Sequence, residues 1–247
     1  MSLRNRVAVV TGGTRGIGKG IALGLAQQGA RIALVYRANK AAAQMALREL
    51  QAAGADCVAV ETDITEPARG EQLIKTVADR YGRIDVLVNN VGEFRWGTLV
   101  ESSVEEWTRI FDSNVLTVFH MCRCAVPLMR KGRWGRIINL GAVGAERAFG
   151  QAKISAYAAA KAAVVAMSRS LALEEAKNGI TVNVVNPSSI DEKDLTLEEA
   201  RKLKDARYPI GRPPTVDDVA AAVSFFASEE AEYVTGQVVN VSGGWML

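Results

Sequence analysis

Short apolar runs alternate with helix-like segments along almost the whole chain, and this alternation limits the fold more than any other feature. The runs are rich in β-branched residues and apolar throughout, which is typical of parallel strands buried on both faces. Repeated strand–helix units of this kind predict an α/β fold, a doubly wound parallel sheet with helices on both faces. The expected strands are Val7–Thr11, Arg31–Tyr36, Cys57–Glu61, Val86–Asn89, Arg136–Leu140, Thr181–Asn186 and Gln237–Val241.

The segments between these runs carry apolar residues at helical spacing. The expected helices are Ile17–Gln28, Lys40–Ala53, Ala68–Tyr81, Val104–Lys131, Ile154–Asn178, Leu197–Arg207 and Val216–Ala227. Asn114 and Pro127 weaken the long fourth helix locally. Because the chain has 247 residues and neither repeats nor a linker, we expect one domain over residues 1–247.

Composition excludes several classes of protein. Hydrophobic residues make up 49% of the chain and charged residues 23%, and the net charge is +3, so no nucleic-acid partner is expected. No apolar run reaches the roughly 20 residues that a membrane helix needs. The sequence opens directly on a strand without a signal-peptide pattern, which predicts a cytoplasmic protein that does not bind membranes.

No metal site is expected. Cys57, Cys122 and Cys124 form no ligand pattern and are predicted to be free thiols, and His120, inside an apolar helical run, is predicted to pack. Basic residues cluster at Arg130–Arg136. The cluster is interpreted either as a solvated turn before a strand or as a docking patch for an acidic partner.

One charged segment, Ser188–Pro214, interrupts the alternation. Within it, Thr196 and Glu199 form a capping box for the short helix expected at Leu197–Arg207. Long loops in compact domains are usually functional or disordered, and this one follows the carboxyl end of a strand, where open α/β sheets bind ligands. We therefore predict that residues 188–214 form a mobile substrate lid; a surface insertion is the alternative.

A glycine-rich loop joins the first strand to the first helix and reads TGGTRGIG over Thr11–Gly18. Gly12, Gly16 and Gly18 allow a tight turn and close approach of a pyrophosphate, while the helix N-terminus supplies free N–H groups and a favourable dipole. Between a strand and a helix, at the start of a βαβ unit, this loop predicts a dinucleotide site on a Rossmann-type domain.

The end of the second strand indicates which dinucleotide binds. An NAD site would place an acidic residue about 20 positions after the glycine loop, to bind the ribose hydroxyls. This chain has Tyr36 and Arg37 there, with Arg15 in the loop, and no carboxylate from Arg31 to Arg48. Two guanidinium groups suit a 2′-phosphate, so NADP(H) is predicted; solvated arginines are the alternative.

Tyr157 and Lys161 lie four residues apart in a predicted helix, so their side chains share one face. The phenol of a free tyrosine has a pKa of about 10, and a nearby ammonium is expected to lower it. Tyr157 could then protonate a carbonyl oxygen as hydride reaches the carbon.

Together these pieces resemble the short-chain dehydrogenase/reductase family over the whole chain, and most of all its 3-oxoacyl-carrier-protein reductases. The matching motifs are Thr11–Gly18, Asp63, Asn89–Gly92, Asn114, Tyr157–Lys161, Asn186–Pro187 and Val241–Gly244.

The resemblance implies roles for the matching residues. Tyr157, Lys161 and Asn114 would be catalytic, with Asn114 holding a water in a proton relay to Lys161. Asp63 and Ile64 would flank the adenine. The cofactor-binding set would be Gly12, Thr14, Arg15, Gly16, Ile17, Gly18, Tyr36, Arg37, Asp63, Ile64, Asn90, Gly92, Tyr157, Lys161, Pro187, Ser188 and Ile190, with Ile190 at the nicotinamide end. A homotetramer is also implied.

The chain departs from the family after the fifth strand, where the family has a serine whose hydroxyl binds the substrate oxygen. Ala142 stands at that position, or Gly141 if the register slips. Losing one preorganised donor to a developing oxyanion typically costs about 10²–10³ in rate. The candidate replacements are Ser155, Ser188 and Gln151, of which Ser188 is preferred. The family's Pro-Gly and the following threonine are also missing at 187–192.

Two functions follow. The first is an NADPH-dependent oxidoreductase that reduces a small-molecule carbonyl to an alcohol; the candidate substrates include a 3-oxoacyl thioester bound to carrier protein or coenzyme A. Phe94, Arg95, Trp96 and Phe149 are expected to border the substrate pocket. The alternative is a weakly active or non-catalytic NADP(H)-binding protein that acts as a sensor or scaffold.

Overall fold

Seven parallel strands form the central sheet of the computed structural model, which describes residues 2–246. The strand order is β3-β2-β1-β4-β5-β6-β7. The strands are β1 (Val7–Thr11), β2 (Arg31–Tyr36), β3 (Cys57–Glu61), β4 (Val86–Asn89), β5 (Gly135–Leu140), β6 (Ile180–Pro187) and β7 (Val238–Val241). All seven strands expected from the sequence are confirmed, and their bounds move by one residue at most.

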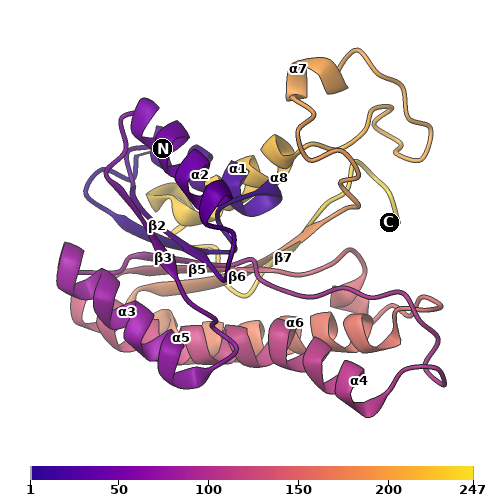
Figure 1. Cartoon of the computed structure of the whole chain (residues 1–247), viewed down its shortest axis with the longest axis horizontal. Coiled ribbons are helices and arrows are strands. Elements are labelled where there is room, and N and C mark those ends of the chain that lie inside the picture. The colour runs from indigo at the N-terminus through magenta and orange to yellow at the C-terminus, as the bar shows by residue number, and fades with distance from the viewer. Residues whose placement is uncertain (1, 247) are drawn as a thin grey trace.

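Helices cover both faces of this sheet, which confirms the doubly wound architecture (Figure 1). One face carries α1 (Gly16–Gln27), α2 (Lys40–Ala52) and α8 (Val216–Ala227). The opposite face carries α3 (Pro67–Tyr81), α4 (Val104–Phe111), α5 (Thr117–Gly132) and α6 (Ser155–Glu175). A short helix, α7 (Leu197–Ala200), lies beyond the sheet on the side of α1 and α8.

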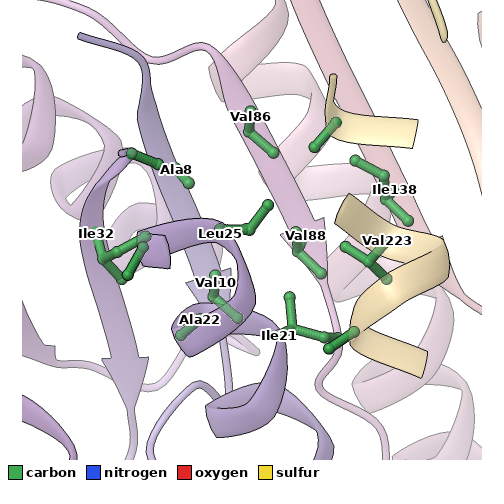
Figure 2. Close-up of a cluster of buried hydrophobic side chains, with 14 of the residues drawn as sticks. Ala8, Val10, Ile21, Ala22, Leu25, Ile32, Val86, Val88, Ile138 and Val223 are labelled. Atoms are coloured by element: carbon green, nitrogen blue, oxygen red, sulfur yellow. The ribbon is translucent and has the colours of Figure 1, made fainter. Parts of the chain in front are cut away.

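Each face of the sheet has its own hydrophobic cluster. Figure 2 shows the cluster under α1 and α8, which contains Val10, Leu25 and Val223. Val9, the neighbour of Val10 in β1, belongs to the cluster on the other face. Because successive side chains of a strand point to opposite faces, a strand buried on both sides must be apolar throughout.

The long helix expected at Val104–Lys131 is interrupted. A π-helical turn, η1 (Asp112–Leu116), separates α4 from α5, and Asn114 lies at its centre. The Nδ2 atom of Asn114 donates to the backbone oxygens of Glu93 and Ile110, both at 2.9 Å. Single π turns inside helices are frequent at functional sites. Pro127, by contrast, is accommodated inside α5.

The segment 188–214 contains a shorter helix than expected. The capping box of Thr196 and Glu199 is confirmed, but α7 ends at Ala200, so the expected helix Leu197–Arg207 is wrong over residues 201–207. The carboxylate of Asp205 accepts hydrogen bonds from the backbone and guanidinium of Arg207, and local bonds of this kind favour a turn over a helix.

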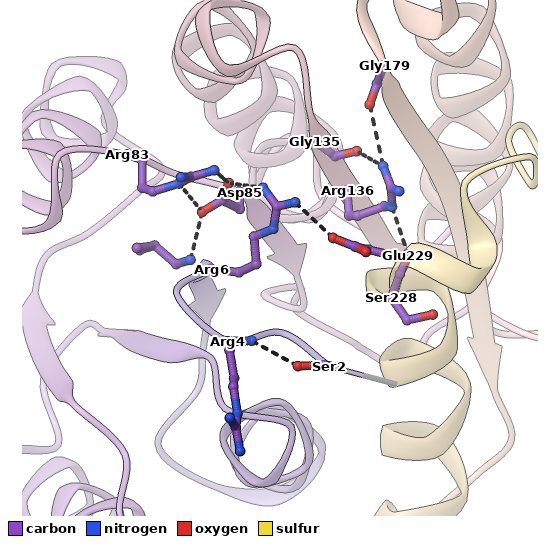
Figure 3. A network of polar contacts seen from close by, with 11 residues as sticks. Ser2, Arg4, Arg6, Arg83, Asp85, Gly135, Arg136, Gly179, Ser228 and Glu229 are labelled. Atoms are coloured by element: carbon purple, nitrogen blue, oxygen red, sulfur yellow. Dashed lines mark hydrogen bonds and ion pairs between the residues drawn. The ribbon is translucent and has the colours of Figure 1, made fainter.

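A polar network ties the amino ends of the strands together, opposite the edge where ligands bind in such sheets (Figure 3). Asp85 is buried and accepts hydrogen bonds from the backbone of Val7 at 2.9 Å and from the side chains of Arg6 and Arg83. Arg136 is also buried here and donates to backbone carbonyls, and burial lowers the pKa of its guanidinium to about 10.

The basic residues at 130–136 therefore differ in their surroundings, and only some of them are exposed to solvent. Arg136 is buried, Arg130 pairs with the buried carboxylate of Glu175, and Lys131 and Arg133 remain exposed. The solvated-turn interpretation is thus wrong for Arg136, and the cluster does not form one continuous basic surface. The three cysteines are free, as expected.

Within residues 2–246, no helix is long and apolar enough to cross a membrane. The same residues contain no cluster of three or more His, Cys, Asp or Glu side chains suited to holding a metal ion.

Candidate active site

The loop between β1 and α1 has the geometry of a phosphate-binding turn. Gly12 (φ +63°) and Gly16 (φ +51°) adopt left-handed backbone conformations that favour glycine. A Cβ atom on Gly18 would lie 2.3 Å from the backbone oxygen of Gly12, so a side chain there would force the turn apart. The three glycines therefore fit the pyrophosphate of a dinucleotide at the N-terminus of α1.

A cavity of about 290 Å³ adjoins this loop. Eight predicted cofactor-binding residues line it: Gly12, Thr14, Arg15, Tyr36, Arg37, Asp63, Ile64 and Gly92. Eight further lining residues were not predicted: Val35, Ala38, Asn39, Thr62, Thr65, Val91, Glu93 and Ser113. Most are sequence neighbours of predicted residues, and Ser113 reaches the cavity because it precedes Asn114 in the π turn.

The side chain of Arg37 is 66% exposed at this cavity. Its Nη1 atom lies 3.9 Å from a carboxylate oxygen of Asp63 and 3.9 Å from one of Glu93. Burial opposes ionisation of Asp63, but hydrogen bonds from Thr65 hold its pKa below the usual value. Both contacts of Arg37 are long for ion pairs, so its guanidinium can turn toward an incoming phosphate at little cost.

The three predicted catalytic residues converge at the carboxyl end of the sheet. Lys161 is buried, and its Nζ atom donates to the backbone oxygen of Leu140 at 2.7 Å and lies 5.5 Å from the centre of the Tyr157 ring. A Cβ atom on Gly92 would lie 2.2 Å from Oδ1 of Asn114 and 3.4 Å from Nζ of Lys161. The structure therefore brings Tyr157, Lys161, Asn114 and Gly92 to one place.

Burial dominates the protonation of this group. It raises the pKa of Tyr157 to about 12 and lowers the pKa of Lys161 to about 8. The expectation that the ammonium would lower the pKa of Tyr157 is not met in this structure, because burial takes the phenolate out of water and no opposing effect of Lys161 accompanies it. Tyr157 consequently stays protonated, which is the form that donates a proton.

The side chain of Asn114 has one hydrogen-bond acceptor without a donor among residues 2–246. Its Oδ1 atom is buried and accepts no hydrogen bond from any residue in 2–246, whereas its Nδ2 atom is fully used. A buried acceptor without a protein partner is usually satisfied by a water molecule.

The structure favours one of the two positions considered for the missing serine, although the correspondence with the family's serine stays a prediction. A Cβ atom on Gly141 would lie 1.9 Å from Oδ1 of Asn186, so no side chain fits at position 141. Ala142, half-buried, is therefore the position that would carry the hydroxyl. The loop after it is held by Glu146, whose carboxylate accepts hydrogen bonds from Asn186 and Asn240, both at 3.0 Å.

None of the three candidate replacements forms a hydrogen bond with Tyr157 within residues 2–246. Ser188 is 7% exposed, and its backbone N–H donates to Val241 at 3.1 Å, which continues the pairing of β6 with β7. The Oγ atom of Ser188 is buried and has no hydrogen-bond partner within residues 2–246, and its role as a donor to substrate stays a prediction. Ser155 begins α6 and is half-buried, and Gln151 is exposed.

Three predicted cofactor residues have structural contacts of their own. Asn90 donates to the backbone oxygens of Thr11 and Gly12, at 3.0 and 3.3 Å, and so braces the glycine loop. Ile190 packs in the cluster under α1 and α8, and Pro187 ends β6. Their contacts with a cofactor stay predictions, as do those of Ile17.

The expected aromatic border of the substrate site is partly in place. The ring of Phe94 meets the ring of Tyr157 edge-on, with centroids 5.0 Å apart, and Trp96 meets Phe94 in the same way at 5.4 Å. Arg95 forms an ion pair with Glu106 of α4. Phe149 lies over Gly144, on the loop that follows Ala142.

Comparisons with known proteins agree with this geometry. The family described as "Enoyl-(Acyl carrier protein) reductase" matches residues 12–246. The chain is 39% identical to the 3-oxoacyl-[acyl-carrier-protein] reductase FabG of Staphylococcus aureus over 97% of this chain and 98% of that protein. It is 38% identical to the FabG of Vibrio cholerae over the full length of both. A solved structure of a putative 3-oxoacyl-reductase from Bacillus thuringiensis superimposes with a TM-score of 0.90, at 33% identity and 98% coverage of both chains.

The fold and the site define an oxidoreductase of the kind that uses a nicotinamide cofactor. The chain belongs to the short-chain dehydrogenase/reductase family, and its likeness to ketoreductases of that family extends over its whole length.

Proposed function

We propose that this protein reduces a carbonyl group to an alcohol with NADPH, and that 3-oxoacyl thioesters, bound to carrier protein or coenzyme A, are among its substrates. The observation that supports this most is the convergence of Tyr157, Lys161 and Asn114 beside Gly92, next to the nucleotide-sized cavity. A panel of ketones and 3-oxoacyl thioesters with NADPH, followed by loss of nicotinamide absorbance, tests the proposal. Cofactor binding without any turnover would favour the sensor or scaffold instead.

The chain's own residues position the substrate and move the proton. The bound cofactor supplies a hydride to the carbonyl carbon, and the hydroxyl of Tyr157 donates a proton to the carbonyl oxygen. Lys161 binds the ribose next to the nicotinamide and places a positive charge beside the tyrosine. Asn114 holds a water through its unpartnered Oδ1 atom, and this water returns a proton from solvent through Lys161.

We further infer that Arg15 and Arg37 bracket the 2′-phosphate of NADPH. The change Arg37→Ala should weaken NADPH binding about tenfold and leave NADH binding nearly unchanged, because only NADPH carries that phosphate. Calorimetry with both cofactors measures this. Arg48→Ala, an exposed arginine on α2 outside the cavity, is the matched control. Equal affinities of the unmodified protein for NADPH and NADH would overturn the inference.

Sequence reasoning missed a third cation near the glycine loop, Lys193, which lines the neighbouring cavity between α1, α8 and the lid rather than the cavity that adjoins the loop. A Cβ atom on Gly16 would lie 3.0 Å from Cδ of Lys193, so the lysine stem crosses the first residue of α1. Lys193 has no ion pair within residues 2–246, and Gly16 stands where the pyrophosphate is expected. Only the fold brings these two residues together, because 177 positions separate them in the sequence. We infer that the lid at 188–214 closes over the cofactor through this lysine.

The change Lys193→Met should weaken NADPH and NADH binding by the same factor, about three- to tenfold, because both carry the pyrophosphate. It should also flatten the salt dependence of binding, since one screened charge is lost. Lys204→Met, an exposed lysine elsewhere in the lid, is the control for calorimetry at several salt concentrations. A loss confined to NADPH would place Lys193 at the 2′-phosphate, against this assignment.

The family resemblance supports two further proposals, a homotetrameric assembly and a cytoplasmic location.

A further inference from the structure

The fold brings a carboxylate, that of Glu93, to the cavity beside the glycine loop, which Arg15 and Arg37 also line. Glu93 follows β4 and Arg37 follows β2, and these two strands lie on either side of β1, so both residues reach the same edge of the sheet. The sequence-based prediction of NADP(H) depends on the absence of a carboxylate from Arg31 to Arg48. Glu93 therefore returns a negative charge to a site where the end of the second strand supplies none.

The carboxylate of Glu93 lies between two guanidinium groups. Its Oε1 atom is 3.9 Å from Nη1 of Arg37, and its Oε2 atom is 2.9 Å from Nε of Arg109 on α4. The contact with Arg109 is the shorter one, so Glu93 is paired with Arg109 and acts on Arg37 as a nearby charge. Since only 37% of the Glu93 side chain is exposed, solvent screens this charge in part.

The backbone of Glu93 is held by the π turn. Its N–H donates to Oγ of Ser113 at 3.2 Å, and its oxygen accepts from Nδ2 of Asn114 at 2.9 Å. These bonds, together with the pair to Arg109, keep the carboxylate at the cavity when a cofactor enters. Because neither backbone bond uses the side chain, a substitution that keeps its length should leave the π turn and Asn114 in place.

A phosphate bound by Arg37 would lie close to Glu93. A phosphate oxygen that accepts a hydrogen bond from a guanidinium comes within about 3 Å of its nitrogen. Oε1 of Glu93 is already 3.9 Å from one of the Arg37 nitrogens, so the two anions would share one cation. Like charges at such short range repel. NADPH carries a phosphate at this position and NADH carries a neutral hydroxyl, so the repulsion acts on NADPH alone.

We propose that Glu93 is a specificity-determining residue, whose carboxylate lowers the preference of this site for NADPH over NADH. The proposal rests on the NADPH-dependent reduction proposed above, with the 2′-phosphate at Arg15 and Arg37. The two arginines attract the phosphate and Glu93 opposes it, so the preference is the difference between these effects. NADPH should still bind more tightly than NADH, but by a smaller factor than the arginines alone would give.

The change Glu93→Gln should raise the ratio of NADPH affinity to NADH affinity about three- to tenfold, measured by calorimetry at low salt without substrate. Glutamine keeps the length of the side chain, removes its charge and leaves Arg109 unpaired, so the net charge beside the cavity rises by one. The gain should shrink as salt is added, because salt screens the charge. Asp79→Asn, which removes a carboxylate 65% exposed in the last turn of α3, is the matched control and should leave the ratio unchanged.

The same change in a protein that already carries Arg37→Ala tests whether Glu93 acts on the phosphate itself. The ratio should rise again, because the repulsion does not need Arg37. A gain that vanishes without Arg37 would mean that Glu93 only competes for the arginine, and the proposed repulsion would be wrong.

Two further outcomes separate this proposal from the proposed function. If the unmodified protein prefers NADPH and Glu93→Gln leaves the ratio unchanged or lowers it, the role of Glu93 is overturned and the NADPH-dependent reduction stands. Equal affinities of the unmodified protein for the two cofactors would instead reject the placement of the 2′-phosphate at Arg15 and Arg37, and the role of Glu93 with it.

Discussion

The change Tyr157→Phe should lower carbonyl reduction by at least about 10³-fold, near the upper range for removal of a general acid. Phenylalanine keeps the ring that Phe94 contacts and removes one oxygen, so the site should keep its shape. NADPH binding should change little, because the glycine loop, Arg37 and Lys193 supply most of the proposed contacts. Steady-state kinetics with the best substrate of the ketone panel, together with NADPH calorimetry, measures both quantities.

The pH dependence of activity should show which residue's protonation state limits carbonyl reduction by the unmodified protein. The pKa of Tyr157, raised to about 12, keeps its proton in place over the accessible pH range. The pKa of Lys161, lowered to about 8, means that its positive charge is present below that pH and is lost as the pH rises through it. Activity of the unmodified protein should therefore fall above about pH 8.

Substantial carbonyl reduction by Tyr157→Phe would mean that another group donates the proton.

The features that the sequence predicts well are set by local spacing. The strands are recognisable because β1, for example, places Val9 on one face and Val10 on the other, and burial of both faces requires an unbroken apolar run. The glycine loop is recognisable because Gly12 and Gly16 must adopt left-handed conformations within a few residues of each other. Tyr157 and Lys161 share a face because one helix carries both.

The features that the sequence missed depend on contacts between distant segments. The π turn exists because Asn114 bonds to Glu93, on the loop after β4. The pKa of Tyr157 is raised rather than lowered because its burial depends on packing against distant residues such as Phe94. Spacing along the sequence carries none of this information.

The change Ala142→Ser should raise kcat/KM for acetoacetyl-coenzyme A about tenfold, because it returns a donor to the developing alkoxide. The structure supports this position over its neighbour: Ala142 is half-buried with a β-carbon already present, whereas Gly141 is closed by Asn186. One added hydroxyl should not recover the whole factor, since the rest of the site evolved without it. Steady-state kinetics of the unmodified protein and of Ala142→Ser, at saturating NADPH, compare the two values of kcat/KM.

Two serine-to-alanine changes show whether another donor has already replaced the missing one. If Ser155 or Ser188 acts on the substrate, its change to alanine should be severe and Ala142→Ser should add little; Ser188, whose buried Oγ atom has no partner within residues 2–246, is the preferred candidate.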